Sequence, residues 1–138
     1  MIAAFCIPGP PQGKERPRFT RSGYAYTPPK TKEYEALVRS CWQQQSGVRF
    51  PDGVPVKATV KAFFPIPQSL SKKRRSLLMG APHTKKCDID NLLKAVFDSL
   101  NTYAYADDSS VYSVVAEKHY SDSPRVEVVL EADGAYPP

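Results

Sequence analysis

The residues best suited to chemistry lie in the segment Asp88-Ile89-Asp90-Asn91-Leu92-Leu93-Lys94 and in a later acidic pair, Asp107-Asp108. Carboxylates that are held close together repel one another, and each raises the pKa of its neighbour. A cation relieves this repulsion, and hard oxygen ligands suit Mg²⁺ or Mn²⁺. The spacing therefore indicates a site for a divalent metal ion at the start of a helix.

Phosphodiester hydrolysis is a reaction that such a site can support. A divalent ion neutralises charge on the phosphate oxygens, orients water and lowers the pKa of that water. Two carboxylates one residue apart converge on one ion at a strand-to-helix junction, with Asp88 at or before the N-cap and Asp90 in the first turn. Lys94, one turn on, can reach a phosphate or a leaving oxygen. A purely structural role for the same residues, as helix cap and turn, stays open.

The charges are divided unevenly along the chain. Residues 1–87 hold 16 Lys and Arg against 4 Asp and Glu, a balance of +12, whereas residues 88–138 hold 3 against 10, a balance of −7. A basic surface beside an acidic centre suits a polyanion that the first holds and the second cleaves. The sequence therefore favours a metal-dependent enzyme that acts on nucleic acid.

Two basic segments are expected to contact the DNA backbone. The first lies in a proline-rich loop over residues 8–30, where basic residues alternate with Phe19, Tyr24 and Tyr26. The second is the basic tract of residues 72–75. Lys86 lies between this tract and the acidic helix. Basic and aromatic side chains together hold phosphates and stack on exposed bases. The expected contacts are Lys14, Arg16, Arg18, Lys72, Lys73, Arg74, Arg75 and Lys86.

The elements that must position these residues follow from periodicity. Residues 2–7 and 54–62 alternate as strands, and residues 110–119 and 125–131 predict two more, joined as a hairpin by the turn at residues 121–124. Helical stripes predict a helix from a Thr31 cap to about Gln45, and a second helix at the acidic segment. Their apolar positions are Tyr34, Leu37, Val38, Cys41 and Trp42, and Ile89, Leu92, Leu93, Val96, Phe97 and Leu100.

These elements predict one compact α/β (α+β) domain over residues 1–138, with a mixed sheet of about four strands and two main helices. Residues 133–138 are expected to be a frayed tail. No pair among Cys6, Cys41 and Cys87 has the spacing of zinc ligands. The N-terminal apolar run is short and stops at Pro8, so we expect a strand there and a cytoplasmic protein.

The ordered set Asp-Ile-Asp-Asn-Leu-Leu-Lys-Ala-Val-Phe-Asp-Ser-Leu, followed by Asp-Asp and a strand, resembles the RusA family of Holliday-junction resolvases. Residues 13–19, 26–28 and 31–35 look like the N-terminal half of its phage and prophage members. The resemblance covers nearly the whole chain. It differs at Cys87, where members commonly carry a basic residue or proline, and Lys86 can substitute there.

The resemblance implies that Asp88, Asp90 and Asp108 bind Mg²⁺, with Mn²⁺ able to replace it, and that Lys94 is the helical lysine of the active site. It implies a homodimer that nicks two opposing strands of a four-way junction symmetrically, in DNA recombination and repair. No membrane and no organic cofactor are expected.

Three points stay open from sequence. Asp107 is the alternative to Asp108 as third ligand. The substrate could be a fork, a flap or other branched DNA. The chain could also be a non-catalytic DNA-binding protein with a structural metal site.

Overall fold

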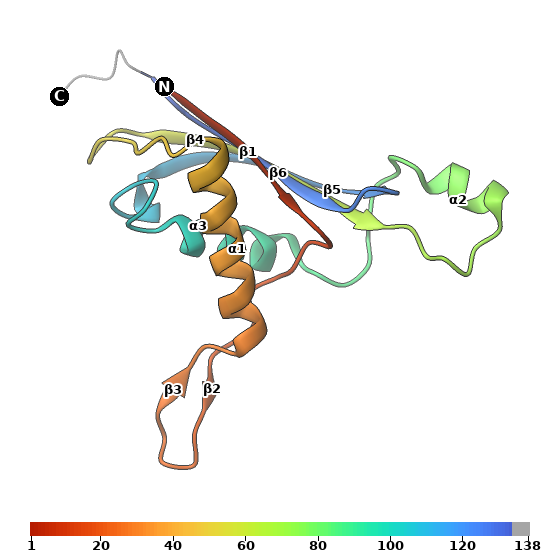
Figure 1. Cartoon of the computed structure of the whole chain (residues 1–138), viewed down its shortest axis with the longest axis horizontal. Helices are drawn as coiled ribbons and strands as arrows, with labels where there is room; N and C mark the ends of the chain where they lie inside the picture. Colours follow the sequence, from red (N-terminus) through yellow and green to blue (C-terminus); the bar gives the residue numbers. More distant parts are fainter. Residues whose placement is uncertain (134–138) are drawn as a thin grey trace.

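A mixed four-stranded sheet with helices packed on one face forms the body of the protein (Figure 1). The computed structural model describes residues 1–133, so the expected tail, apart from Asp133, lies outside the described residues. The strands are β1 (Ile2–Pro8), β2 (Arg18–Phe19), β3 (Ala25–Tyr26), β4 (Val56–Pro65), β5 (Val111–Ser121) and β6 (Arg125–Ala132). The helices are α1 (Pro29–Gln45), α2 (Lys72–Leu78), α3 (Ile89–Leu100) and the short 3₁₀ helix η1 (Asp108–Ser110).

The sheet order is β1-β6-β4-β5, with β4 parallel to β5 and antiparallel to β6, and β1 antiparallel to β6. The predicted α+β class, mixed sheet of about four strands and two main helices are confirmed, and β2 and β3 form a separate two-stranded sheet. The predicted hairpin of β5 and β6 is wrong, because β4 lies between them. The turn between Ser121 and Arg125 can cross β4 because Pro65, paired with Ser121, is the last residue of that strand.

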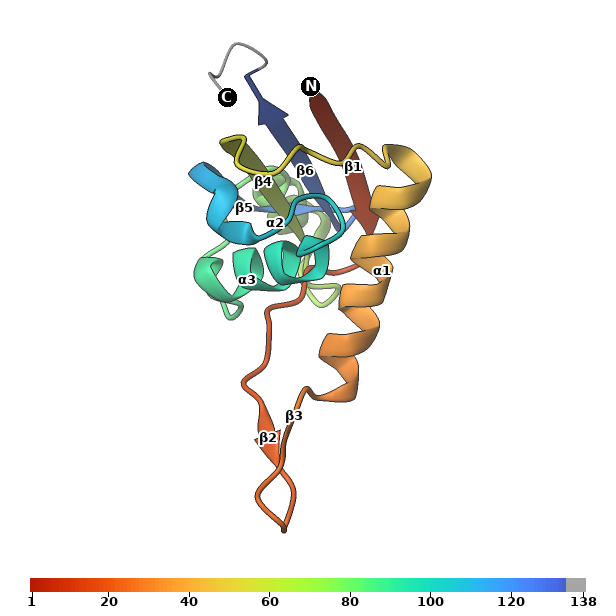
Figure 2. The ribbon, with the colours of Figure 1, turned by 90° about the vertical axis from the view of Figure 1, so that its left-hand side faces the viewer.

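Helices α1 and α3 cover the same face of the sheet and form one core with it (Figure 2). The apolar positions predicted for the two helices contribute to this core, with two exceptions. Leu37 and Ile89 are exposed, and the other predicted positions are buried or half-buried. Every second residue of β4 points into the core and is buried, from Val56 to Phe64. Burial of these apolar side chains is the main stabilising contribution to the fold.

Helix α1 begins two residues earlier than Thr31. Its N-cap is Pro28 and its first residue is Pro29, and proline suits this place because it has a helical φ and no N–H to satisfy. Thr31 is not the cap. It is buried inside the first turn, and its Oγ1 accepts a hydrogen bond from the backbone N–H of Glu15 at 3.3 Å.

The loop over residues 8–30 contains more structure than its composition predicts. Strands β2 and β3 form a small antiparallel hairpin that projects from the body (Figure 2). The segment between β4 and α3, expected to be irregular or partly helical, contains α2, which is capped by the hydroxyl of Ser71. No helix within residues 1–133 is long and apolar enough to cross a membrane.

Truncation of Leu92 tests the core assignment. Leu92 in α3 is fully buried, so Leu92→Ala should lower the free energy of unfolding by about 2–5 kcal/mol. Leu77→Ala is the matched control, because Leu77 in α2 is 72% exposed and its loss should cost less than about 0.5 kcal/mol. Urea denaturation measures both, and equal destabilisation by the two substitutions would contradict the assignment.

Candidate active site

The N-terminal end of α3 presents two of the three expected metal ligands. Asp88 is the N-cap residue, with φ −63° and ψ 144°, and Asp90 lies in the first turn. Both side chains are exposed, and the Asp88 carboxylate makes no capping hydrogen bond to the helix. The positive end of the helix dipole stabilises both negative charges. The expected place of Asp88 at the cap is confirmed.

Cys87, directly before this cap, has the left-handed φ of 89°, which is costly for a residue with a β-carbon. The turn at Cys87 directs the chain from the preceding loop into α3. Burial raises the pKa of the Cys87 thiol, Lys118 opposes this shift, and Asp88 adds to it. At neutral pH the thiol is therefore protonated, which fits packing rather than nucleophilic chemistry.

The proline-rich loop packs against the start of α3. A β-carbon on Gly13 would lie 3.2 Å from Cβ of Asn91 and 3.3 Å from Sγ of Cys87, so glycine permits the close approach. The backbone N–H of Lys14 donates to the carbonyl of Asn91 at 2.9 Å. Between the loop and the helix lies a shallow pocket, lined by Gly13, Lys14, Glu15, Lys86, Cys87, Asp88 and Asn91.

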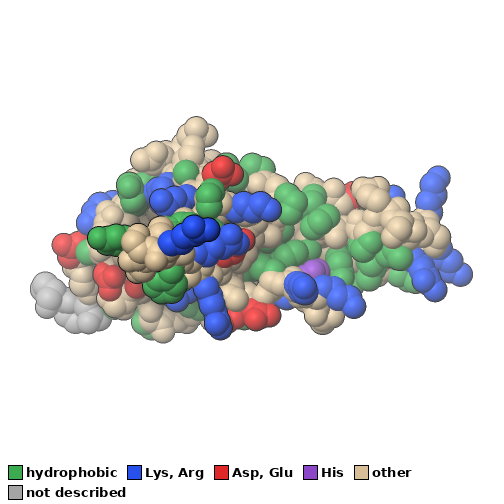
Figure 3. All heavy atoms as spheres, turned by 90° about the horizontal axis from the view of Figure 1, so that it is seen from below, with side chains coloured by type: hydrophobic (Ala, Val, Ile, Leu, Met, Phe, Trp, Pro, Cys, Tyr) green, Lys and Arg blue, Asp and Glu red, His purple; other side chains and the backbone are tan. Residues whose placement is uncertain are grey.

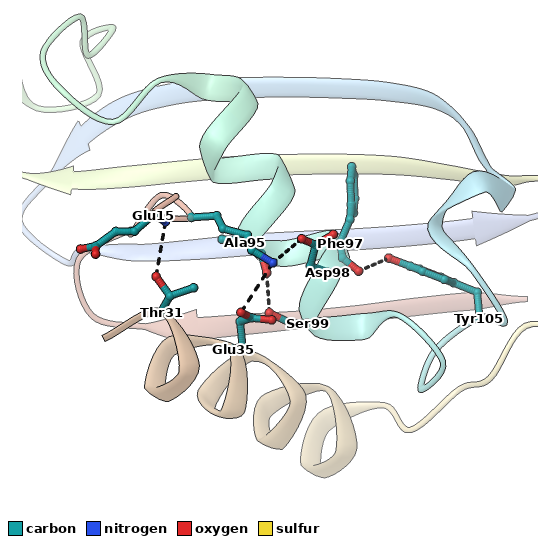
Figure 4. Close-up of polar contacts among 9 residues, drawn as sticks. Glu15, Thr31, Glu35, Ala95, Phe97, Asp98, Ser99 and Tyr105 are labelled. Atoms are coloured by element: carbon teal, nitrogen blue, oxygen red, sulfur yellow. Dashed lines mark hydrogen bonds and ion pairs between the residues drawn. The ribbon is translucent and has the colours of Figure 1, made fainter. Parts of the chain in front are cut away.

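Lys14 links this loop to both main helices. Its Nζ lies 2.5 Å from Oδ2 of Asp98 in α3 and 3.9 Å from Oε1 of Glu35 in α1. In Figure 4 the side chains of Asp98 and Glu35 reach the same ammonium group. The Lys14 side chain is 21% exposed, so the residue first expected to contact DNA forms an internal ion-pair network. Its contact with DNA stays a prediction.

The second acidic pair lies beyond the other end of α3. The Asp107 carboxylate caps η1 by accepting from the backbone N–H of Ser109, and hydrogen bonds from Ser109 lower its pKa. The backbone N–H of Asp108 donates to Oδ1 of Asn101 at 2.8 Å. Burial raises the pKa of Asp108, and the nearby charges of Asp107 and Asp98 raise it further. Asp108 thus faces two other carboxylates.

The described chain does not gather Asp88, Asp90 and Asp108 at one point. Asp108 lies beside Asp98, and the helical rise separates Asp98 from Asp90 by about 12 Å along α3. Within residues 1–133 no three His, Cys, Asp or Glu side chains are grouped as metal ligands. The carboxylate oxygens fit Mg²⁺ chemically, but their placement in this single chain does not make a shared site.

Asp98 is not among the site residues predicted from the sequence. It lies four residues after Lys94, a spacing at which helical side chains can pair, but Asp98 pairs with Lys14 instead. Lys94 is exposed and forms no ion pair within 4.0 Å in the described part of the chain. Its ammonium group is therefore free to meet a phosphate.

The remaining basic residues lie outside α3 itself, in the hairpin, in α2 and in the loop that leads into α3. Arg16 and Arg18 are exposed at the base of the hairpin, and Lys86 is exposed before the N-cap of α3. Helix α2 buries none of its residues and carries the basic tract of residues 72–75. The segment that holds α2, residues 66–88 between β4 and α3, is called the α2 arm below. Seen from below, Lys and Arg side chains gather around the hairpin and at the far end of the α2 arm, on one visible face (Figure 3).

The arm that holds α2 is fixed to the sheet by a buried histidine. The His83 ring stacks on Phe64 with centroids 3.8 Å apart and meets the edge of Tyr120 at 4.9 Å. Its backbone N–H donates to the carbonyl of Lys118 at 3.0 Å. Burial lowers the pKa of His83, and the charge of Lys118 lowers it further, so the ring is neutral at pH 7.

Comparison with known proteins bears directly on this site. The sequence model of the family described as endodeoxyribonuclease RusA matches residues 8–131. The chain is also 37% identical over 136 residues to the uncharacterized protein YqaN of Bacillus subtilis (strain 168), a match that covers 91% of this chain and 93% of that protein. The family match includes every candidate residue from Lys14 to Asp108.

The ion pair between Lys14 and Asp98 should contribute measurably to stability. Both side chains are about one quarter exposed or less, so a double-mutant cycle with Lys14→Met and Asp98→Asn should give a coupling energy of about 1–2 kcal/mol. The exposed pair of Arg18 and Glu15 is the matched control, with an expected coupling below about 0.5 kcal/mol. Denaturant titration of the variants measures both cycles; a negligible Lys14–Asp98 coupling would rule out a structural role for the pair.

Proposed function

Because the chain belongs to the RusA family of endodeoxyribonucleases, we propose that it is a metal-dependent, structure-selective nuclease that resolves four-way DNA junctions. The observation that carries this proposal is the family match over residues 8–131, which includes the whole candidate site. The exposed carboxylates at the start of α3 and the unpaired Lys94 on the same helix support it.

The proposed substrate suits the distribution of charge. The hairpin and the α2 arm present basic side chains on one visible face (Figure 3). A branched DNA that spans both surfaces can reach the α3 helix between them. We propose that Lys94 contacts the scissile phosphate or the leaving oxygen, since it is exposed and has no carboxylate partner within 4.0 Å in the described chain.

Mg²⁺ is the proposed cofactor, with Mn²⁺ able to replace it, and Asp88, Asp90 and Asp108 are its proposed ligands. Carboxylates are the ligands these ions prefer, and a bound ion would stabilise negative charge on the phosphate. Asp108 is separated from Asp88 and Asp90 in the single chain. All three can therefore bind one metal ion only if the chain rearranges or another molecule contributes. The proposed homodimer is one such assembly, and its two-fold symmetry would present two sites to two strands.

Two alternatives compete with junction resolution. The same site could cleave forks, flaps or other branched DNA, or the chain could bind DNA without cleavage and hold a metal ion in a structural role. A cleavage assay on a mobile four-way junction, a fork, a flap and a plain duplex, in Mg²⁺, Mn²⁺ or Ca²⁺, separates them. Symmetric nicking of the junction in Mg²⁺ but not in Ca²⁺ supports the proposal, whereas binding without cleavage in every metal contradicts it.

Removal of the acidic charges should abolish cleavage but not DNA binding. Asp88→Asn, Asp90→Asn and Asp108→Asn each remove a carboxylate without reducing attraction to DNA, and Lys94→Ala should lower the single-turnover rate. Asp122→Asn is the matched control, since Asp122 is an exposed acid in the β5–β6 turn. Junction cleavage and gel-shift binding measure the two effects, and normal cleavage by Asp88→Asn would show that the metal assignment is wrong.

Neutralisation of the α2 tract should flatten the salt dependence of DNA binding. Each phosphate contact contributes a slope of roughly −0.9 in log affinity against log salt on duplex DNA. Alanine at residues 72–75 should therefore reduce the slope by up to about three to four units if all four residues make contacts. Replacement of Lys57 and Lys61, which are exposed on β4, is the control. An unchanged slope in the tract variant would leave the hairpin as the main DNA contact.

A further inference from the structure

The hairpin of β2 and β3, residues 18–26, is a small but well-defined projection (Figure 2). Arg18 pairs with Tyr26, and Phe19 pairs with Ala25. The tip is closed by backbone hydrogen bonds of 2.9 Å from Thr20 to Tyr24 and from Gly23 to Thr20. Gly23 has a φ of +85°, a conformation that glycine adopts without strain. The tip is thus held by specific turn geometry.

The hairpin carries exposed aromatic side chains on both of its faces. Phe19 is 70% exposed, Tyr24 is 73% exposed and Tyr26 is 41% exposed. Side chains alternate between the two faces of a strand, and paired residues share a face. Tyr24 and Tyr26 therefore lie on the face of Arg18, and Phe19 lies on the opposite face.

All charged residues in the segment that carries these aromatic side chains, residues 16–32, are basic. Residues 16–32 contain Arg16, Arg18, Arg21, Lys30 and Lys32 and no acidic residue. The one ion pair of this segment in the described structure joins Arg18 to Glu15 at 3.5 Å, with both side chains largely exposed. Such a surface attracts a polyanion and repels a basic partner.

The base of the hairpin is joined firmly to the rest of the protein. Lys14 connects it to α3 and α1, and the backbone N–H of Glu15 donates to Thr31 in α1. All nine residues of the hairpin, 18–26, are exposed, so none of their side chains is buried in the core. Since a two-stranded hairpin gains little stability by itself, its exposed aromatic residues are not explained by folding.

We propose that the hairpin is a base-stacking wedge that enters branched DNA at the branch point, with Phe19 stacked on an unpaired base at one face and Tyr24 on a base at the other. The proposal rests on the proposed function, because it takes branched DNA as the substrate. Arg16, Arg18 and Arg21 hold the flanking phosphates. Aromatic stacking is tolerant of sequence, so the wedge recognises the absence of pairing rather than a base identity.

Binding without divalent metal tests the wedge independently of cleavage. The probes are a four-way junction, a duplex with a short unpaired bubble and the same duplex fully paired. Phe19→Ala and Tyr24→Ala should each weaken binding to the junction and bubble roughly 5- to 150-fold, the range for one lost stack, and leave duplex binding unchanged. Tyr112→Ala is the matched control, since Tyr112 on β5 is an equally exposed aromatic residue, at 69%, away from the hairpin.

A second measurement reports stacking directly. The variants Phe19→Trp and Tyr24→Trp keep an aromatic ring, so both proteins should bind the bubble as tightly as the natural protein does. The fluorescence of the new tryptophan should be quenched when the bubble binds but not when the paired duplex binds. Trp42 gives a constant background because it is 6% exposed in the core. Quenching by both DNAs, or by neither, overturns the wedge.

The outcomes separate this proposal from the nuclease assignment. If the alanine variants bind and cleave junctions as the natural protein does, the wedge is wrong and the nuclease assignment stands. If the natural protein cleaves no branched DNA but the variants lose bubble binding selectively, the wedge stands and the nuclease assignment fails. If the variants change the oligomeric state in sedimentation and bind the bubble normally, the hairpin contacts protein and the wedge is wrong.

Discussion

Parallel pairing between β4 and β5 is the constraint on which the rest of the structure depends. Parallel neighbours cannot be joined by a tight turn, so the chain between them must cross over one face of the sheet. Helix α3 lies in this crossover, and its apolar side is buried in the core that the helices share with the sheet. Its polar side, with Asp90, Lys94 and Asp98, is left facing outward or toward the N-terminal loop. The position of the candidate site therefore follows from strand direction.

The same crossover explains the two basic surfaces. The connection from β4 to α3 is longer than the crossover requires, and the excess forms the α2 arm, which is attached to β5 through His83 and its neighbours. On the other side, the loop between β1 and α1 packs at Gly13 against the start of α3 and then extends into the hairpin. Both projections begin beside the acidic helix, so DNA bound by either lies near it.

Sequence periodicity was sufficient for the two main helices, the strands of the four-stranded sheet and the cap at Asp88, because each depends on residues close in the chain. Strand neighbours were harder to predict. The alternation in residues 111–121 and 125–132 is the same whether the two strands pair with each other or with β4, and the short turn favoured the wrong choice. The hairpin of β2 and β3 was missed because two-residue strands are too short to show alternation. The pairing of Lys14 with Asp98 joins residues 84 positions apart, so only the fold brings these charges together.

The place of β6 between β1 and β4 also has a consequence for how the protein is made. During synthesis β1 emerges first, but its sheet partner is β6, which spans Arg125–Ala132. Until those residues leave the ribosome, the apolar side chains of Phe5 and Ile7 have no neighbouring strand. The nascent chain therefore carries an unpaired apolar segment throughout most of its translation, a state that favours binding by chaperones. A chain released before Arg125 would contain the residues of both helices but lack the strand that joins β1 to β4.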